Sequence, residues 1–171
     1  MEKIYEYPNL GMDQNNQQIN LNWPPPILLA EAKDSIWVSE DGEIERISHN
    51  NSLEKISQHR PLLCNLRATA SRLNCKPFLG FDLLELFAFV KPAQFCVPTP
   101  HGIAKALNMP IPESGLDAAL VLLDATEVLL EELPLSPNKE KVILIAELMG
   151  HCRWVWAPMV LNALGASPKA N

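Results

Sequence analysis

Proline is the residue that most limits what this chain can fold into. The 171 residues include 15 prolines, nearly double the average frequency of about 5%. A proline inside a helix removes a backbone hydrogen bond and clashes with the preceding turn, so it ends or kinks the element that it enters. The sequence therefore predicts several short elements in one compact domain rather than a long helical bundle. The boundary prolines stand at 24–26, 61, 92, 98, 100, 110, 112, 134 and 137.

The charge balance argues against several classes of function. Asp and Glu number 20 against 14 Lys and Arg, a formal net charge of -6, whereas free-standing binding to nucleic acid or anionic membrane needs a basic surplus on some face. Apolar runs stay short of the roughly 18 residues of a membrane span, and the first residues lack the apolar core of a secretory leader. We therefore expect a cytoplasmic protein without a membrane partner.

The cysteines and the segment boundaries follow from local composition. The cysteines lack C-x-x-C pairing and stand in apolar sequence, which predicts reduced thiols; they are Cys64, Cys75, Cys96 and Cys152. An Asn/Gln-rich stretch ending in three prolines predicts a poorly ordered start, pinned by Trp23. We divide the chain into a tail at 1–26, a domain at 27–135, a terminal helix at 136–165 and a short tail at 166–171.

Strand patterns gather in the first half of the chain. The predicted strands are 27–32, 35–40, 43–48 and 61–65. The pair Asp41-Gly42 between the second and third is typical of a two-residue type I′ hairpin turn. That turn would place Ile36 opposite Ile47 and give the hairpin one apolar face.

Helical patterns dominate the second half. The predicted helices are 52–58, 66–73, 82–91, 101–108, 115–132 and 139–164. Asn51 is the expected cap of the first helix, and Thr99 followed by Pro100 opens the fourth. The last helix is expected to kink at Pro158 and to end at Gly165. It carries a wide apolar stripe of Ile145, Leu148, Cys152, Val155, Met159 and Ala163.

Motifs for several common chemistries are missing from the sequence. Neither GxxxxGK[ST] nor GxGxxG occurs, and no serine stands in a GxSxG elbow. The four histidines are far apart, which does not favour a histidine metal site. Carboxylates remain, because Asp117, Asp124 and Glu131 recur every seven residues and so share a helix face. A solvated acidic face is the simplest interpretation of that pattern.

Three segments nevertheless carry a resemblance to a known family. FDLLELFAFVKP, GIAKALNMPIP and DAALVLLDATEVLLEEL follow one another between 81 and 133. Together they resemble the C-terminal half of a DnaQ-like 3′–5′ exonuclease domain, most closely the version at the N-terminus of DinG-type DNA helicases. Asp82 fits that family's strand-end Asp, Asp124 its final Asp-Ala, and Asn65 its upstream Asn. The resemblance covers about 27–133 and implies an α/β, RNase H-like mixed sheet flanked by helices, with an extra C-terminal helix.

The sequence departs from this family at the residues that would do chemistry. The resemblance implies a two-metal nuclease, in which four carboxylates hold two divalent ions. On the first strand only Glu31 is acidic, with Leu29 or Ala30 where an Asp belongs. Thr69 replaces the Asp of the second motif, and Ala119 replaces the general-base His of the third.

One of the four carboxylates, Asp124, is clearly kept, and a single Asp cannot hold two Mg²⁺ ions. The leading hypothesis is therefore a pseudo-exonuclease without catalytic residues or cofactor. It would be an accessory or docking domain of a DinG-type helicase, with the helicase motor domain as its partner and DNA contacted only through the parent protein. The ending RWVWAPMVLNALG is also similar to that of alphaproteobacterial DinG-type helicases.

Two alternatives stay open from the sequence. One is an active exonuclease that uses Mg²⁺ or Mn²⁺ held by Glu31, Asp124 and further ligands. The other is a protein-interaction module unrelated to nucleases, forming a homodimer through the apolar stripe of the last helix. A weak candidate for nucleic-acid binding is the basic cluster Arg67, Arg72 and Lys76, although a solvated face is the simpler interpretation.

Overall fold

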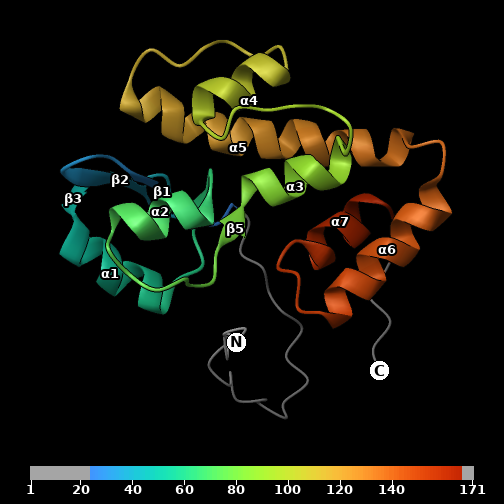
Figure 1. The fold of residues 1–171 in the computed structure, drawn as a ribbon, viewed down its shortest axis with the longest axis horizontal. Helices are drawn as coiled ribbons and strands as arrows, with labels where there is room; N and C mark the ends of the chain where they lie inside the picture. Colours follow the sequence, from blue (N-terminus) through green and yellow to red (C-terminus); the bar gives the residue numbers. More distant parts are fainter. Residues whose placement is uncertain (1–23, 167–171) are drawn as a thin grey trace, which may run out of the picture.

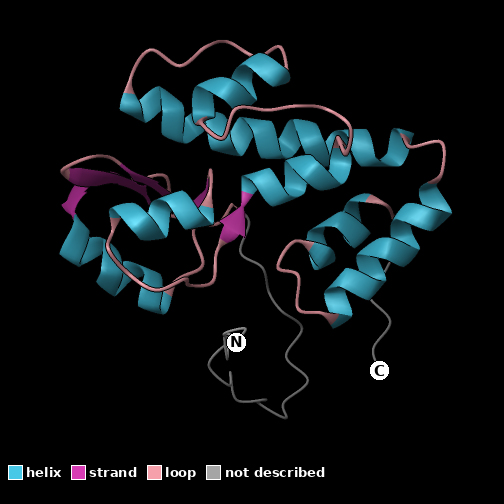
Figure 2. Ribbon diagram, in the orientation of Figure 1, coloured by secondary structure: helices cyan, strands magenta, loops and turns pink. Residues whose placement is uncertain are grey.

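The computed structural model, which describes residues 24–166, contains a mixed five-stranded sheet (Figures 1 and 2). The strands are β1 (Ile27–Ala30), β2 (Asp34–Val38), β3 (Ile44–Ser48), β4 (Leu62–Leu63) and β5 (Phe81–Asp82). Their order across the sheet is β3-β2-β1-β4-β5, with β2 antiparallel to both neighbours and β1, β4 and β5 mutually parallel. The predicted α/β class is confirmed.

Helices cover both faces of this sheet (Figure 1). The helical elements are α1 (His49–Gln58), α2 (Leu66–Arg72), α3 (Leu83–Val90), α4 (Pro100–Ala106), α5 (Gly115–Glu132), the 3₁₀ turn η1 (Leu133–Leu135), α6 (Lys139–His151) and α7 (Ala157–Ala163). α1 and α2 lie on one face, α3 and α5 on the other, and α4 packs on the outside of α5. Among residues 24–166, no helix is both long enough and apolar enough to cross a bilayer.

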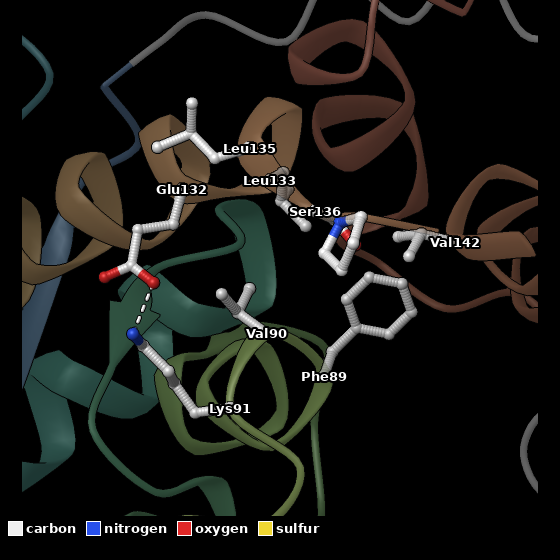
Figure 3. A pocket seen from close by; sticks show the side chains of 9 residues that line it. Phe89, Val90, Lys91, Glu132, Leu133, Leu135, Ser136 and Val142 are labelled. Carbon is white, nitrogen blue, oxygen red and sulfur yellow. Dashed lines mark ion pairs between the residues drawn. The ribbon is translucent and has the colours of Figure 1, made fainter. Parts of the chain in front are cut away.

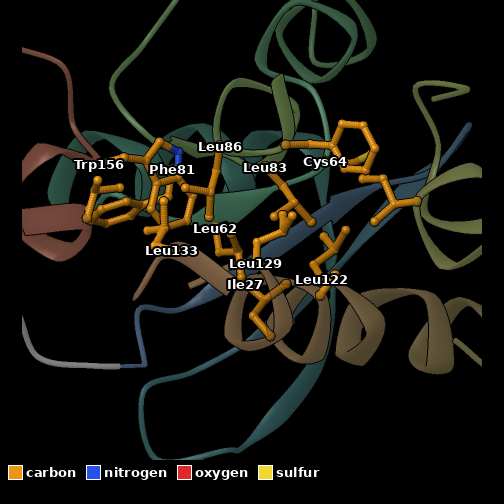
Figure 4. Close-up of a cluster of buried hydrophobic side chains, with 14 of the residues drawn as sticks. Ile27, Leu62, Cys64, Phe81, Leu83, Leu86, Leu122, Leu129, Leu133 and Trp156 are labelled. Atoms are coloured by element: carbon orange, nitrogen blue, oxygen red, sulfur yellow. The ribbon is translucent and has the colours of Figure 1, made fainter. Parts of the chain in front are cut away.

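The hydrophobic core is split into two layers by the sheet. Because successive strand residues point to opposite faces, Ile27 joins the larger cluster with α3, α5 and α7, whereas Leu28 joins the smaller one with Leu73. Figure 4 shows the larger cluster, in which Phe81 and Trp156 meet edge to face with ring centroids 5.0 Å apart. The predicted tail ends earlier than residue 26, since Pro25 and Pro26 are buried.

The remaining tail residues, 1–23 with Trp23 and 167–171, lie outside the described part of the chain. The cysteines Cys64, Cys75, Cys96 and Cys152 are all unpaired, as predicted.

Capping residues set the helix boundaries. Asn65, Asp82, Thr99 and Ser114 each accept a hydrogen bond from a backbone N–H in the first turn that follows, which satisfies one of the unpaired donors there. The predicted Thr99 cap is confirmed. The predicted Asn51 cap is wrong, because Ser48 accepts from the Asn51 N–H and the helix starts earlier, at residue 49.

The turn between β2 and β3 differs from the predicted type I′ hairpin. The Ser39 N–H donates to the Glu43 carbonyl at 2.8 Å and the Gly42 N–H to the Ser39 carbonyl at 2.9 Å, with Gly42 at φ 81°. This is a three-residue loop closed by a left-handed glycine. The extra loop residue shifts the register by one, so Ile36 lies opposite Arg46 rather than Ile47.

The predicted continuous last helix is also wrong. The chain breaks between α6 and α7 at Arg153, whose φ of 65° is left-handed. Pro158 therefore stands in the first turn of a new helix instead of kinking an old one. Gly165 ends α7 at φ 68°, as predicted. Much of the predicted stripe faces outward, since Ile145 and Leu148 are exposed on α6 together with Leu144.

Candidate functional site

The end of β1 is the place where the resemblance puts the first catalytic carboxylates. Leu29 and Glu31 alternate with Ala30 and therefore share the α5 side of the sheet. Leu29 is half-buried and packs against the larger core cluster. An aliphatic side chain thus occupies the position on this face where an Asp two residues before Glu31 would stand.

Glu31 is bound by an arginine. The Arg46 guanidinium donates through Nη1 to Glu31 Oε2 at 2.6 Å and to Asp34 Oδ1 at 2.8 Å, and these carboxylates raise the pKa of Arg46. His49 Nε2 lies 3.1 Å from the backbone carbonyl oxygens of both Glu31 and Asp34. A protein cation therefore neutralises the only acid that the first strand offers.

The two predicted site residues on α5, Ala119 and Asp124, lie in different surroundings. The first residue of this helix, Gly115, lies directly against the Glu31 side chain, which would have to shift to accommodate a side chain at this position. Ala119, one turn later, is fully buried in the core. Asp124 follows Gly115 by nine residues, about two and a half turns and roughly 14 Å along the axis, so it projects from the opposite side of the helix. It is exposed, together with Asp117 and Glu131.

The other predicted site residues lie on or beside α2. Thr69 is buried inside the domain. Arg67 and Lys76 are exposed, and Arg72 donates from Nη1 to the Ala30 carbonyl at 3.1 Å, which ties its side chain to the sheet. The structure therefore brings Arg72 and Glu31 to the same end of β1, and leaves Asp124 on the far side of α5.

A buried polar centre forms around Asp82, the residue at the end of β5 that the resemblance matches to a strand-end Asp. Its Oδ1 accepts from the Leu84 N–H at 3.0 Å and its Oδ2 from the Leu66 N–H at 2.8 Å, so one carboxylate caps α3 and α2 together. The Trp156 indole donates to the Asp82 carbonyl at 2.8 Å. Burial raises the pKa of Asp82 despite these hydrogen bonds, and raises the pKa of the nearby Cys64 thiol to about 12.

A groove and a smaller hollow open on the surface of the described residues. The groove, of about 550 Å³, lies between the ends of α3 and α5 and the start of α6 (Figure 3). Phe89 and Val142 line it, and Lys91 forms an ion pair with Glu132 at its rim. The hollow, of about 320 Å³, lies between the loop before α5 and the outer side of that helix, next to Asp124.

The donor groups do not fit a two-metal centre. Within the described residues, no three or more His, Cys, Asp or Glu side chains are grouped to hold a metal ion. Glu31 is paired with Arg46, and Asp124 faces away from it across α5. Comparisons found no matching family model, no curated protein and no solved structure with significant similarity to this chain.

Proposed function

We propose that this chain is a non-catalytic accessory domain with RNase H-like architecture, of the kind that precedes the motor of DinG-type DNA helicases, and that it works by docking. The strand order β3-β2-β1-β4-β5, with β2 as the one antiparallel strand, supports this architecture. A mixed sheet flanked by helices is also what the sequence resemblance implies. The helix that follows β5 and the long helix α5 also stand in the expected chain order.

The ion pair at the end of β1 is the observation that most strongly supports the proposed loss of catalysis. Two-metal hydrolysis needs carboxylates that converge on closely spaced divalent ions, and Mg²⁺ tolerates poor geometry badly. Here Arg46 holds Glu31, and Asp124 projects from the other side of the neighbouring helix. Leu29, Thr69 and Ala119 offer no carboxylate to complete the set.

A nuclease assay tests this proposal directly. The full chain is incubated with 3′-labelled and 5′-labelled single-stranded DNA, with Mg²⁺ and separately with Mn²⁺, and products are resolved on a sequencing gel. We expect no cleavage above a buffer control in either metal. The proposal fails if metal-dependent cleavage occurs and is abolished in both Asp124→Ala and Glu31→Gln. Equal cleavage in a mock preparation that lacks the chain identifies a contaminating nuclease, whereas metal-dependent cleavage absent from the mock preparation contradicts the proposal.

A second candidate function, self-association through the last helices, is favoured by one observation on α6. Its inward side chains, such as Val142 and Ala146, pack in the core, yet Leu144 and Leu148 on the outer side are 65% and 63% exposed. Large apolar side chains gathered on the exposed side of a helix are typical of an interaction surface. Sedimentation equilibrium of the chain and of Leu144→Ser/Leu148→Ser distinguishes the cases. A dimer that the substitution dissociates supports the candidate, and a monomer at all concentrations rejects it.

A further inference from the structure

The hollow beside Asp124 combines an apolar floor with an acidic rim. It is formed by the loop from Pro110 to Glu113 and by the first turns of α5. Ile111 is 51% exposed and Leu120 is 39% exposed, so apolar surface remains open to solvent between the loop and the helix. Exposed apolar side chains gathered in a concave surface are typical of interaction sites.

The carboxylates around this floor are not neutralised by the protein. Within residues 24–166, neither Glu113 nor Asp124 has an ion-pair partner. Asp117, the third acid, accepts hydrogen bonds from the Ser114 N–H and hydroxyl, which balance no charge. The sequence from Met109 to Asn138 contains no Lys or Arg. Beyond the hollow, the exposed Glu131 follows Asp124 by seven residues and so lies on roughly the same side of α5.

The larger groove near α6 has no comparable unpaired charge among its described lining residues. Its rim charges, Lys91 and Glu132, form an ion pair with each other, so they attract neither sign of charge strongly. Of the two surfaces, the hollow beside Asp124 is therefore the one whose unpaired negative charge favours a particular kind of binding partner. Uncompensated charge of one sign favours a partner of the other sign and speeds its association.

We propose that this hollow docks a basic amphipathic peptide segment of a partner protein, in which Lys or Arg alternates with large aliphatic residues. One aliphatic side chain covers Ile111 and Leu120, and flanking cations pair with Glu113 and Asp124. The inference rests on the docking role proposed above and names its surface and its partner chemistry. Asp124, on this account, is retained as a docking residue rather than as a remnant of a metal site.

Fluorescence anisotropy with synthetic peptides tests the proposal. The probe is a fluorescein-labelled peptide of alternating lysine and leucine, and the comparison peptides replace either lysine by glutamate or leucine by serine. We expect the lysine-leucine peptide to bind the full chain and both comparison peptides to bind much more weakly. Each exposed ion pair contributes modestly, so Glu113→Gln/Asp124→Asn should weaken binding about fivefold. Ile111→Ser should weaken it by a similar factor without changing net charge.

A matched double variant separates docking from bulk attraction. Asp41→Asn/Glu54→Gln removes the same number of carboxylates from exposed positions away from α5 and should leave the affinity within about twofold, as for surface changes that touch no contact. Amide NMR shifts caused by the peptide should centre on Leu120 and Asp124. The proposal is overturned by equal losses in both double variants, by shifts centred elsewhere, or by no binding at about 1 mM peptide. The nuclease assay uses no peptide, so the proposed absence of catalysis and the proposed peptide docking can each fail without the other.

Discussion

Asp82 should be among the most costly polar residues to remove, because one carboxylate caps two helices. In Asp82→Ala the Leu84 N–H at the start of α3 and the Leu66 N–H at the start of α2 both lose their acceptor. Losing a helix cap costs about 1 kcal/mol, and leaving a partly buried N–H unpaired costs about 1–3 kcal/mol. Burial already raises the pKa of this carboxyl, which offsets part of that sum. We expect the free energy of unfolding to fall by about 2–3 kcal/mol.

Urea unfolding followed by circular dichroism at pH 7 measures this loss, provided that the slope against urea is unchanged. Asp82→Asn keeps one acceptor oxygen for one helix and should lose about half as much. Asp124→Ala is the matched control, since its carboxylate is exposed and should contribute within about 0.5 kcal/mol. A loss below about 1 kcal/mol in Asp82→Ala, or one equal to that of Asp124→Ala, would refute the double-cap reasoning.

Three further perturbations follow from the same geometry. Because burial raises the folded pKa of Asp82, ionising this carboxyl costs part of the stability that its hydrogen bonds supply; that part is present in acid and is lost as pH rises from the ordinary Asp pKa through the folded pKa. Relative to Asp82→Asn, the wild-type chain should therefore lose stability as pH rises from about 4 to 7 in urea titrations, and a rise in relative stability over this range contradicts the reasoning. Gly115→Ala would place a Cβ against Glu31 and 2.8 Å from Ile36 Cδ1; because both contacts are the ends of flexible side chains, the free energy of unfolding should change by less than about 1 kcal/mol, and a larger loss in urea unfolding would argue against this. Trp156→Phe removes the indole N–H from the Asp82 carbonyl and should cost about 1–2 kcal/mol, measured by urea unfolding; a loss under about 0.5 kcal/mol would show that the hydrogen bond contributes little.

Local chemistry made most of the elements predictable. The α5 span of 115–132 and the Thr99 cap followed from periodicity and from cap residues, which act within a few positions of one another. The hairpin register did not follow, because Asp41-Gly42 fits both a two-residue turn and a three-residue loop with Gly42 in the left-handed region. The pairing of β2 with β3 selects the second arrangement, and a single sequence does not reveal that choice.

Contacts between distant segments explain the larger failures. The break in the predicted last helix depends on Arg153 at positive φ, which lets Trp156 reach Asp82. The local sequence does not predict that an arginine adopts this left-handed conformation. The position of Asp124 in the fold could not be predicted for a related reason. The resemblance matches Asp124 to a carboxylate of the family, but the side of α5 that faces the sheet is set by where Gly115 and Ala119 pack.

The hydrogen bond from Trp156 to Asp82 joins residues 74 positions apart in the chain. During synthesis, the parallel edge strand β5 emerges long before the helix that covers it, and the larger core can close only when the last helix follows. Contacts of such long sequence separation slow folding because the loop must close before they stabilise it. An uncovered strand edge meanwhile favours pairing with other chains. A chain that stops before Trp156 should therefore be lost to aggregation even though all five strands are present.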